Sequence, residues 1–192
     1  MKYKVLLLCY FGILGGVVNG DVYAADTKLK VKLTSGTCDV ALDPQRLDLG
    51  DNISPSDLSS SGSWSTPKSF KVKLTDCGVG KSAKLTVAGD VISQTDDAQK
   101  RMFRDAANST SVNFGVLIFS KEPATMGQWT DVLDPTSTTN NGVSVDLSEL
   151  NNRAMDVPFW AAVTCGTSAL CADSSTRSGT LQASVTFTFS YS

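Results

Sequence analysis

The sequence predicts an all-β sandwich of the immunoglobulin-like kind, and two observations lead to this fold class. First, almost every segment with a regular hydrophobic pattern alternates with period two, the periodicity of a strand with one buried face. Second, stretches rich in Ser, Thr, Asn, Gly and Pro separate these segments, as in 51–69 and 134–142. Short strands joined by such turns are typical of an antiparallel sandwich.

Seven segments have the pattern of strands, and each is short and rich in β-branched or aromatic residues. In chain order they cover residues 29–33, 70–74, 84–88, 112–119, 143–147, 157–163 and 185–192. Only the segment around 98–107 has a helical composition, and its few apolar positions predict no more than a surface turn. We find no internal repeat and no second domain.

The first 24 residues have the features of a signal peptide. A basic start, 1–4, precedes an apolar run at 5–18 and the small-residue cleavage signal Val22-Tyr23-Ala24. The apolar run is about fourteen residues long, too short to span a bilayer comfortably. We therefore expect residues 1–24 to be removed and the remainder to be exported as one domain.

Composition argues against several classes of function. The net charge is −2 and there is no basic cluster, so nucleic acid is not an expected partner. Histidine is absent, which removes the commonest general base and the commonest metal ligand. No nucleophile motif or catalytic pair of carboxylates occurs. The sequence therefore predicts a protein that is not an enzyme and has no metal or other cofactor.

Four of the five cysteines lie after the predicted cleavage site, at positions 38, 77, 165 and 171. An even number in an exported chain predicts disulfides, and four cysteines allow three pairings. The spacing favours Cys38 with Cys77 and Cys165 with Cys171. The second pair has the spacing of a zinc half-site, but the absence of histidine argues against metal.

The segment 25–37 contains an unusually regular alternation. Leu29, Val31 and Leu33 share one face of the predicted strand, and three lysines share the other. One interpretation is an ordinary first strand that pairs within its own sandwich, its lysines protecting an exposed edge. The other is a strand that leaves its own domain and completes the sheet of another molecule. Burial of the three apolar side chains would contribute roughly 5–9 kcal/mol before ordering costs.

The last predicted strand raises the complementary question. It places four apolar side chains on one face and Ser or Thr on the other; the apolar ones are Val185, Phe187, Phe189 and Tyr191. Such a strand needs a neighbour on each side, and no later segment of the sequence supplies one.

Several motifs resemble the chaperone/usher pilus subunits of the type 1 fimbrial group. These are the run CDVALDPQRLDLGD at 38–51, the strand FKVKLTDCG at 70–78, the penultimate Tyr191, and Gly179, fourteenth from the end of the sequence. The resemblance covers the whole of 25–192. It implies an extension at 25–37 followed by a pilin domain at 38–192.

The resemblance implies an incomplete immunoglobulin-like sandwich that lacks its last strand, which a donor strand from a chaperone or another subunit supplies. It makes Leu29, Val31 and Leu33 the donor, and the acceptor groove includes Val185, Phe187, Phe189 and Tyr191. Gly179 and Tyr191 stand at the positions used in chaperone recognition. An isolated chain is then expected to leave an apolar groove open to water.

The implied partners are a periplasmic pilus chaperone, the outer-membrane usher, neighbouring pilin subunits and, through the fibre, a host receptor. The implied location is a fimbria at the cell surface, reached through the periplasm. The short extension favours a minor or tip-proximal adaptor subunit over a rod-forming one. The chain differs from the family in Leu33, where members often have glycine, and in its second cysteine pair.

A second class of function is a fimbrial adhesin, a lectin-like module that recognises host glycans. Exposed aromatic rings can stack on sugars, and the candidates are Trp64 and Trp129, both in predicted loops. Trp160 lies within a strand pattern and is expected in the core.

Overall fold

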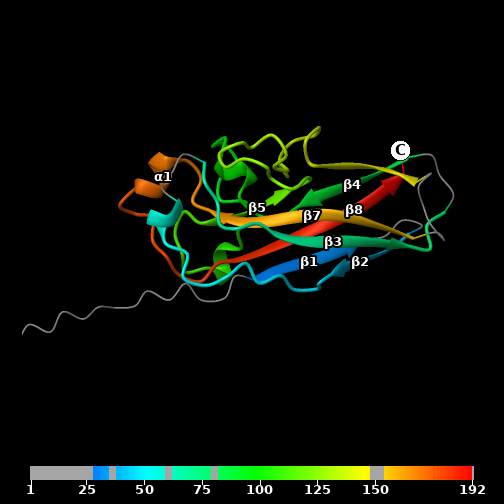
Figure 1. Cartoon of the computed structure of the whole chain (residues 1–192), viewed down its shortest axis with the longest axis horizontal. Helices are drawn as coiled ribbons and strands as arrows, with labels where there is room; N and C mark the ends of the chain where they lie inside the picture. The colour runs from blue at the N-terminus through cyan, green and yellow to red at the C-terminus, as the bar shows by residue number, and fades with distance from the viewer. Residues whose placement is uncertain (1–27, 35–37, 59–61, 79–81, 148–153, 192) are drawn as a thin grey trace, which may run out of the picture.

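The computed structural model describes residues 28–34, 38–58, 62–78, 82–147 and 154–191. Within these ranges the chain forms two four-stranded sheets that pack face to face, with short helices confined to the connections (Figure 1). The predicted all-β sandwich is therefore confirmed. The predicted signal peptide, 1–24, lies outside the described residues.

One sheet has the strand order β1-β8-β4-β6. Its members are β1 (Lys28–Thr34), β4 (Ser82–Ala88), β6 (Gly142–Asp146) and β8 (Gln182–Tyr191). Strand β4 pairs antiparallel with both β6 and β8. Strand β1 is the exception, because it runs parallel to β8.

The other sheet has the order β2-β3-β7-β5, and all its pairs are antiparallel. Its members are β2 (Asp39–Asp43), β3 (Lys68–Thr75), β5 (Gly115–Phe119) and β7 (Met155–Thr164). The predicted strands match observed ones to within a few residues. Strand β2 was not predicted, because its five residues contain a single buried side chain.

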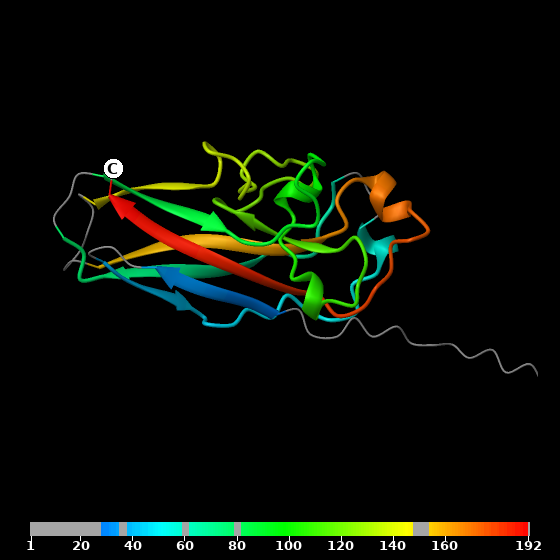
Figure 2. The same cartoon turned by 180° about the vertical axis from the view of Figure 1, so that it is seen from behind.

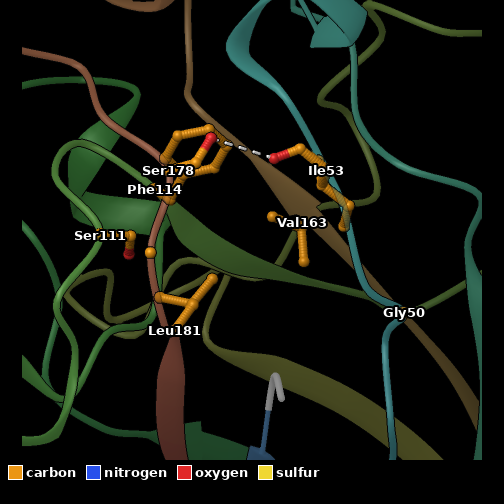
Figure 3. Close-up of a pocket in the computed structure, with 8 residues that line it drawn as sticks. Gly50, Ile53, Ser111, Phe114, Val163, Ser178 and Leu181 are labelled. Atoms are coloured by element: carbon orange, nitrogen blue, oxygen red, sulfur yellow. Dashed lines mark hydrogen bonds between the residues drawn. The ribbon is translucent and has the colours of Figure 1, made fainter. Parts of the chain in front are cut away.

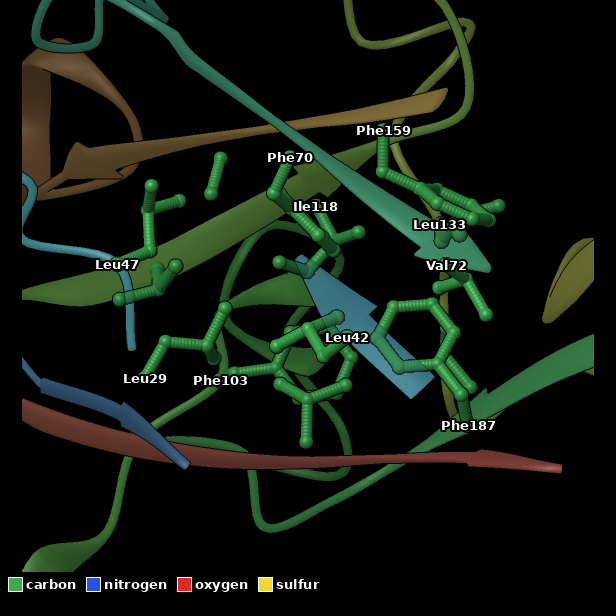
Figure 4. Close-up of a cluster of buried hydrophobic side chains, with 14 of the residues drawn as sticks. Leu29, Leu42, Leu47, Phe70, Val72, Phe103, Ile118, Leu133, Phe159 and Phe187 are labelled. Atoms are coloured by element: carbon green, nitrogen blue, oxygen red, sulfur yellow. The ribbon is translucent and has the colours of Figure 1, made fainter. Parts of the chain in front are cut away.

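The main core lies between the two sheets (Figure 4). Phe70 and Phe159 come from one sheet and Phe187 from the other, and their ring centroids lie 5.0–5.9 Å apart. All three rings are buried. This alternation of inward apolar and outward polar residues is what the period-two pattern of the sequence predicts.

A second apolar cluster lies on the outer face of the β5–β7 pair. Leu117 and Phe119 point to this side of β5, opposite Val116 and Ile118 of the main core, and they meet Met102, Trp64, Val132 and Ala162. Because both faces of β5 are covered, all five of its residues are buried. This explains why β5 is a continuous apolar run.

The segment 98–107 corrects one prediction. Its two single 3-10 turns, η2 (Gln99–Arg101) and η3 (Ala106–Asn108), agree with the predicted turn. It is not only a surface turn, however, because Met102 and Phe103 between them are completely buried. Phe103 forms bridges to Val91 and Val116, which hold the segment against the sandwich.

Both predicted disulfides are confirmed. Cys38 is bonded to Cys77, and Cys165 to Cys171. The second bond joins the residue after β7 to the short helix α1 (Ser168–Ala172), which lies against the 3-10 turn η1 (Pro55–Leu58) at one end of the sandwich (Figure 1). It therefore closes the loop that precedes β8.

Within one chain, β1 pairs inside its own sandwich, which is the first of the two interpretations given for the segment 25–37. In both views β1 lies beside β8 of the same chain (Figures 1 and 2). The expectation of an open groove in an isolated chain is therefore wrong. No later strand lies beside β8 in the described residues, and the chain's own first strand takes that place.

Candidate functional site

The candidate site is the acceptor edge, which we define as the side of β8 that faces β1. Strand β8 owes its length to an uninterrupted alternation over ten residues, and the inward side chains at 183, 185, 187 and 189 are all buried. Of the four predicted groove residues, Val185, Phe187 and Phe189 lie in this row. Tyr191 ends it and is 38% exposed.

The two edges of β8 pair with neighbouring strands over different ranges of residues. Strand β4 pairs with residues 186–191, whereas β1 pairs with residues 182–188. Only Thr186 to Thr188 thus have strand partners on both sides. The side taken by β1 can hold one strand at a time, because each backbone N–H and C=O points to one neighbour.

The three predicted donor residues all lie on β1. In the parallel register Leu29 is opposite Ala183, Val31 opposite Val185 and Leu33 opposite Phe187. Leu29 is only 1% exposed and points into the main core (Figure 4). The structure therefore brings the predicted donor and acceptor segments together within one chain.

Gly179 lies three residues before β8, where the chain passes very close to another segment. A Cβ atom at this position would stand 2.6 Å from the amide nitrogen of Ser111 and 2.7 Å from Thr110 Oγ1. The amides of Thr110 and Ser111 both donate to the carbonyl oxygen of Thr180, at 2.9 and 3.0 Å. Gly179 therefore has a packing requirement within the chain itself.

Arg104 supports the segment against which Gly179 packs. Its guanidinium donates to the carbonyl oxygens of Phe114 at 3.2 Å and of Ser111, and to Ser111 Oγ at 3.2 Å. Burial lowers the pKa of the Arg104 guanidinium below its ordinary value, and the group stays protonated near neutral pH. A charged donor with several carbonyl acceptors holds the 109–114 loop in a fixed shape.

A small cavity of about 10 Å³ lies beside Gly179, at the end of the sandwich where β8 begins (Figure 3). Ile53, Phe114 and Leu181 line it, and Ser178 Oγ closes one side by donating to the carbonyl oxygen of Ile53 at 3.3 Å. This volume holds no more than one water molecule. The cavity is therefore a packing defect and offers no room for a small-molecule ligand.

Tyr191 marks the opposite end of β8 and contacts the first disulfide. Its hydroxyl donates to the carbonyl oxygen of Gly78 at 3.3 Å and lies 3.7 Å from Cys38 Sγ. Its ring packs edge-on against Phe189, with centroids 5.1 Å apart. Tyr191 thus links the end of β8 to the residues that the Cys38–Cys77 bond joins.

The tryptophans give little support to the glycan-binding alternative. Trp64 is 3% exposed and packs against Phe119, 5.1 Å between centroids, so its face is closed to a sugar. Trp129 and Trp160 are half-buried against the same outer cluster. Trp160 therefore packs outside the sheet rather than in the main core, a correction to the sequence-based expectation.

Two kinds of feature are absent from the described residues. They contain no group of three or more His, Cys, Asp or Glu side chains placed to hold a metal ion. No helix in these ranges has the length and apolar character needed to cross a membrane.

Sequence reasoning missed the contribution of residues 105–111 to the site. The amide of Asp105 donates to the carbonyl oxygen of Gln182 at 2.7 Å, and Ser109 Oγ accepts from the amide of Gln182 at 3.0 Å. This segment has no strand pattern, so hydrophobic periodicity could not find it. The only available signal was Gly179, which marks a place where another backbone comes close.

Comparison with known proteins gives a fold and no sequence family. No family model matches the chain, and no curated protein matches it. Among solved structures, the P pilus rod subunit PapA is similar at a TM-score of 0.55 and 16% identity, over 82% of this chain and all of PapA. At this identity the likeness shows that the two chains share a fold.

Two further solved structures are less similar. The CupB6 tip adhesin from Pseudomonas aeruginosa has a TM-score of 0.45 and 10% identity, over 83% of this chain and 40% of the adhesin. The antigen and type I fimbria protein BPSL1626 from Burkholderia pseudomallei has a TM-score of 0.37 and 15% identity, over 86% of this chain and 87% of that protein.

Proposed function

We propose that this protein is a structural, non-enzymatic subunit of an adhesive fimbria, joined to its neighbours by strand donation. In this proposal β1 of one chain pairs with the acceptor edge of the next. The subunit is a minor or tip-proximal adaptor of the fibre. It reaches the cell surface through the periplasm with the help of a chaperone and an usher.

One observation carries the proposal. The strand that lies beside β8, with its buried apolar row, comes from the opposite end of the sequence. No hairpin joins β1 to β8, and about 150 residues lie between them. A strand attached in this way can be replaced by the same strand of another copy without any change in the rest of the fold. The fold shared with a pilus rod subunit supports the same conclusion.

The proposal also assigns roles to the two ends of β8. Gly179 and Tyr191 flank the acceptor edge, and both are expected to contact the chaperone while the subunit waits for its neighbour. Their contacts within the chain are compatible with this role, because a chaperone strand would replace β1 and leave the 109–114 loop and the first disulfide in place.

The test uses a triple variant, Leu29→Asp, Val31→Asp and Leu33→Asp. Because burial of three carboxylates is strongly unfavourable, the variant strand cannot enter an acceptor edge. We expect purified wild-type chains to form linear oligomers, seen by electron microscopy and size-exclusion chromatography, and the variant to form none. A matched control replaces the three lysines at 28, 30 and 32 with serine and should still assemble.

The variant must also retain its own acceptor edge. A fluorescent peptide with the sequence of residues 25–37 should bind to it, which fluorescence anisotropy measures. A variant that assembles as well as the wild type would contradict the proposal. A variant that is folded but rejects the peptide would contradict it too, and would make β1 an ordinary first strand.

A further inference from the structure

We infer that β1 is a self-capping strand: in the free monomer it closes the chain's own acceptor edge, and it must leave before that edge accepts a strand from another chain. The inference rests on the proposed function and adds a control step to it. The subunit then has a closed monomeric form and an open form competent for assembly.

The first argument is mutual exclusion. Strand β4 occupies one side of β8, and β1 occupies residues 182–188 on the other. A donor strand needs the same backbone groups that β1 already uses, so the two cannot bind together. Uptake of a donor strand therefore requires β1 to separate from β8 over its seven residues.

The second argument concerns how firmly β1 is attached. Within the described residues it lies at the outer edge of its sheet, with β8 as its single strand partner. Parallel pairing is slightly less stable per residue than antiparallel pairing. Edge elements with one partner are the ones that open locally, before the whole domain unfolds.

The third argument is that the sandwich stays tethered when β1 leaves. The bond from Cys38 to Cys77 begins four residues after Thr34 and fixes the start of β2 to the end of β3. The three rings that meet at the centre of the core come from β3, β7 and β8. Separation of β1 thus removes Leu29 from the core and leaves these contacts in place.

A covalent lock tests this inference. Lys30 is opposite Ser184 in the parallel register, so Lys30→Cys with Ser184→Cys allows a disulfide between β1 and β8. Mass spectrometry establishes that the bond forms. A mild reductant should open this surface bond, whereas Cys38–Cys77 and Cys165–Cys171 are buried and should persist. A matched control locks Lys84 to Ser144, a registered pair of β4 and β6.

The readout is uptake of the fluorescent 25–37 peptide by the full chain. The β1–β8 lock should slow uptake at least tenfold when oxidised, and reduction should restore the wild-type rate. The β4–β6 lock should leave the rate unchanged, and so should Lys30→Cys alone. Size-exclusion chromatography should show the oxidised β1–β8 variant as a monomer under conditions in which the reduced form assembles.

Two results would overturn the inference, and they are distinguishable. If the locked and reduced chains take up the peptide equally fast, β1 does not guard the acceptor edge, while strand donation itself stands. If the wild-type chain takes up no peptide at any concentration but is folded, the proposed function fails, and self-capping fails with it.

Discussion

Strands β1 and β2 are neighbours in the sequence, yet the structure holds them in different ways. Strand β2 pairs antiparallel with β3, and the Cys38–Cys77 bond fixes the residue directly before it. Strand β1 belongs to the other sheet and pairs parallel with β8. A disulfide holds β2 in place, whereas β1 is held by non-covalent contacts. A strand that can separate therefore directly precedes one that cannot. This difference is the physical basis of both proposals.

The largest effect is expected from removal of the Phe187 ring, which packs between the two sheets. Phe187 is completely buried and contacts Phe70 and Phe159, so Phe187→Ala should lower the free energy of unfolding by about 3–5 kcal/mol. Urea unfolding followed by circular dichroism measures this. Thr188→Ala, on the opposite face, is the control and should change it by less than about 0.5 kcal/mol. Equal losses in the two variants would contradict the assigned core.

The next effect tests the anchor of β2. Replacing Cys38 and Cys77 with serine should lower the free energy of unfolding by about 4 kcal/mol, because the bond spans 39 residues. The same change at Cys165 and Cys171, which are six residues apart, should cost about 2 kcal/mol. Urea midpoints of the two variants give the comparison. A greater loss from the short loop would contradict the proposed anchoring role of the first bond.

A smaller effect is expected from Leu29→Ala on β1. Truncation of a buried leucine commonly costs 2–5 kcal/mol, but a strand that opens by itself limits the global loss, which we expect below about 2 kcal/mol. Amide exchange over 28–34 should rise at least tenfold, while exchange over 39–43 stays unchanged. Hydrogen exchange with mass spectrometry measures both. A parallel rise in the two strands would show that they open together.

The smallest effect is expected from an exposed ion pair that joins β2, the strand held by the first disulfide, to β3. Lys73 Nζ lies 2.6 Å from a carboxylate oxygen of Asp43. A hydrogen bond and the positive charge of Lys73 hold the pKa of Asp43 below its ordinary 3.8, and Asp43 raises the pKa of Lys73 above 10.5. The pair therefore stabilises the fold fully between about pH 3.8 and pH 10.5, the ordinary pKa values of the two groups. Its contribution is lost as pH falls through the lowered pKa of Asp43, or rises through the raised pKa of Lys73.

Because both side chains are about half exposed, Lys73→Met should lower the Tm only slightly at pH 7. The difference from the wild type should diminish at pH 2, because Asp43 loses its charge as pH falls through its lowered pKa, and it should shrink in high salt. Calorimetry at the two pH values measures this. A difference that persists unchanged at pH 2 would mean that packing, and not charge, is responsible.

Prediction from the sequence succeeded where the signal was local. The alternation in 185–191 predicts which β8 side chains are buried, and Val185, Phe187 and Phe189 are. It failed where burial depends on a distant segment. Met102 and Phe103 lie in a stretch with no strand period, and Trp64 lies in a polar loop, yet all three are buried because the second cluster and the bridges of Phe103 bring separate segments together.

The amino-acid sequence by itself determined the fold class, the two faces of each predicted strand and the favoured pairing of the cysteines. These follow from the period of two and from spacing, and both properties belong to short stretches of chain. Only the tertiary structure decided which strand lies beside β8, in which direction it runs, and why position 179 must be glycine. Each of these depends on contacts between residues 68 or more positions apart, and no local pattern records which distant backbone will approach.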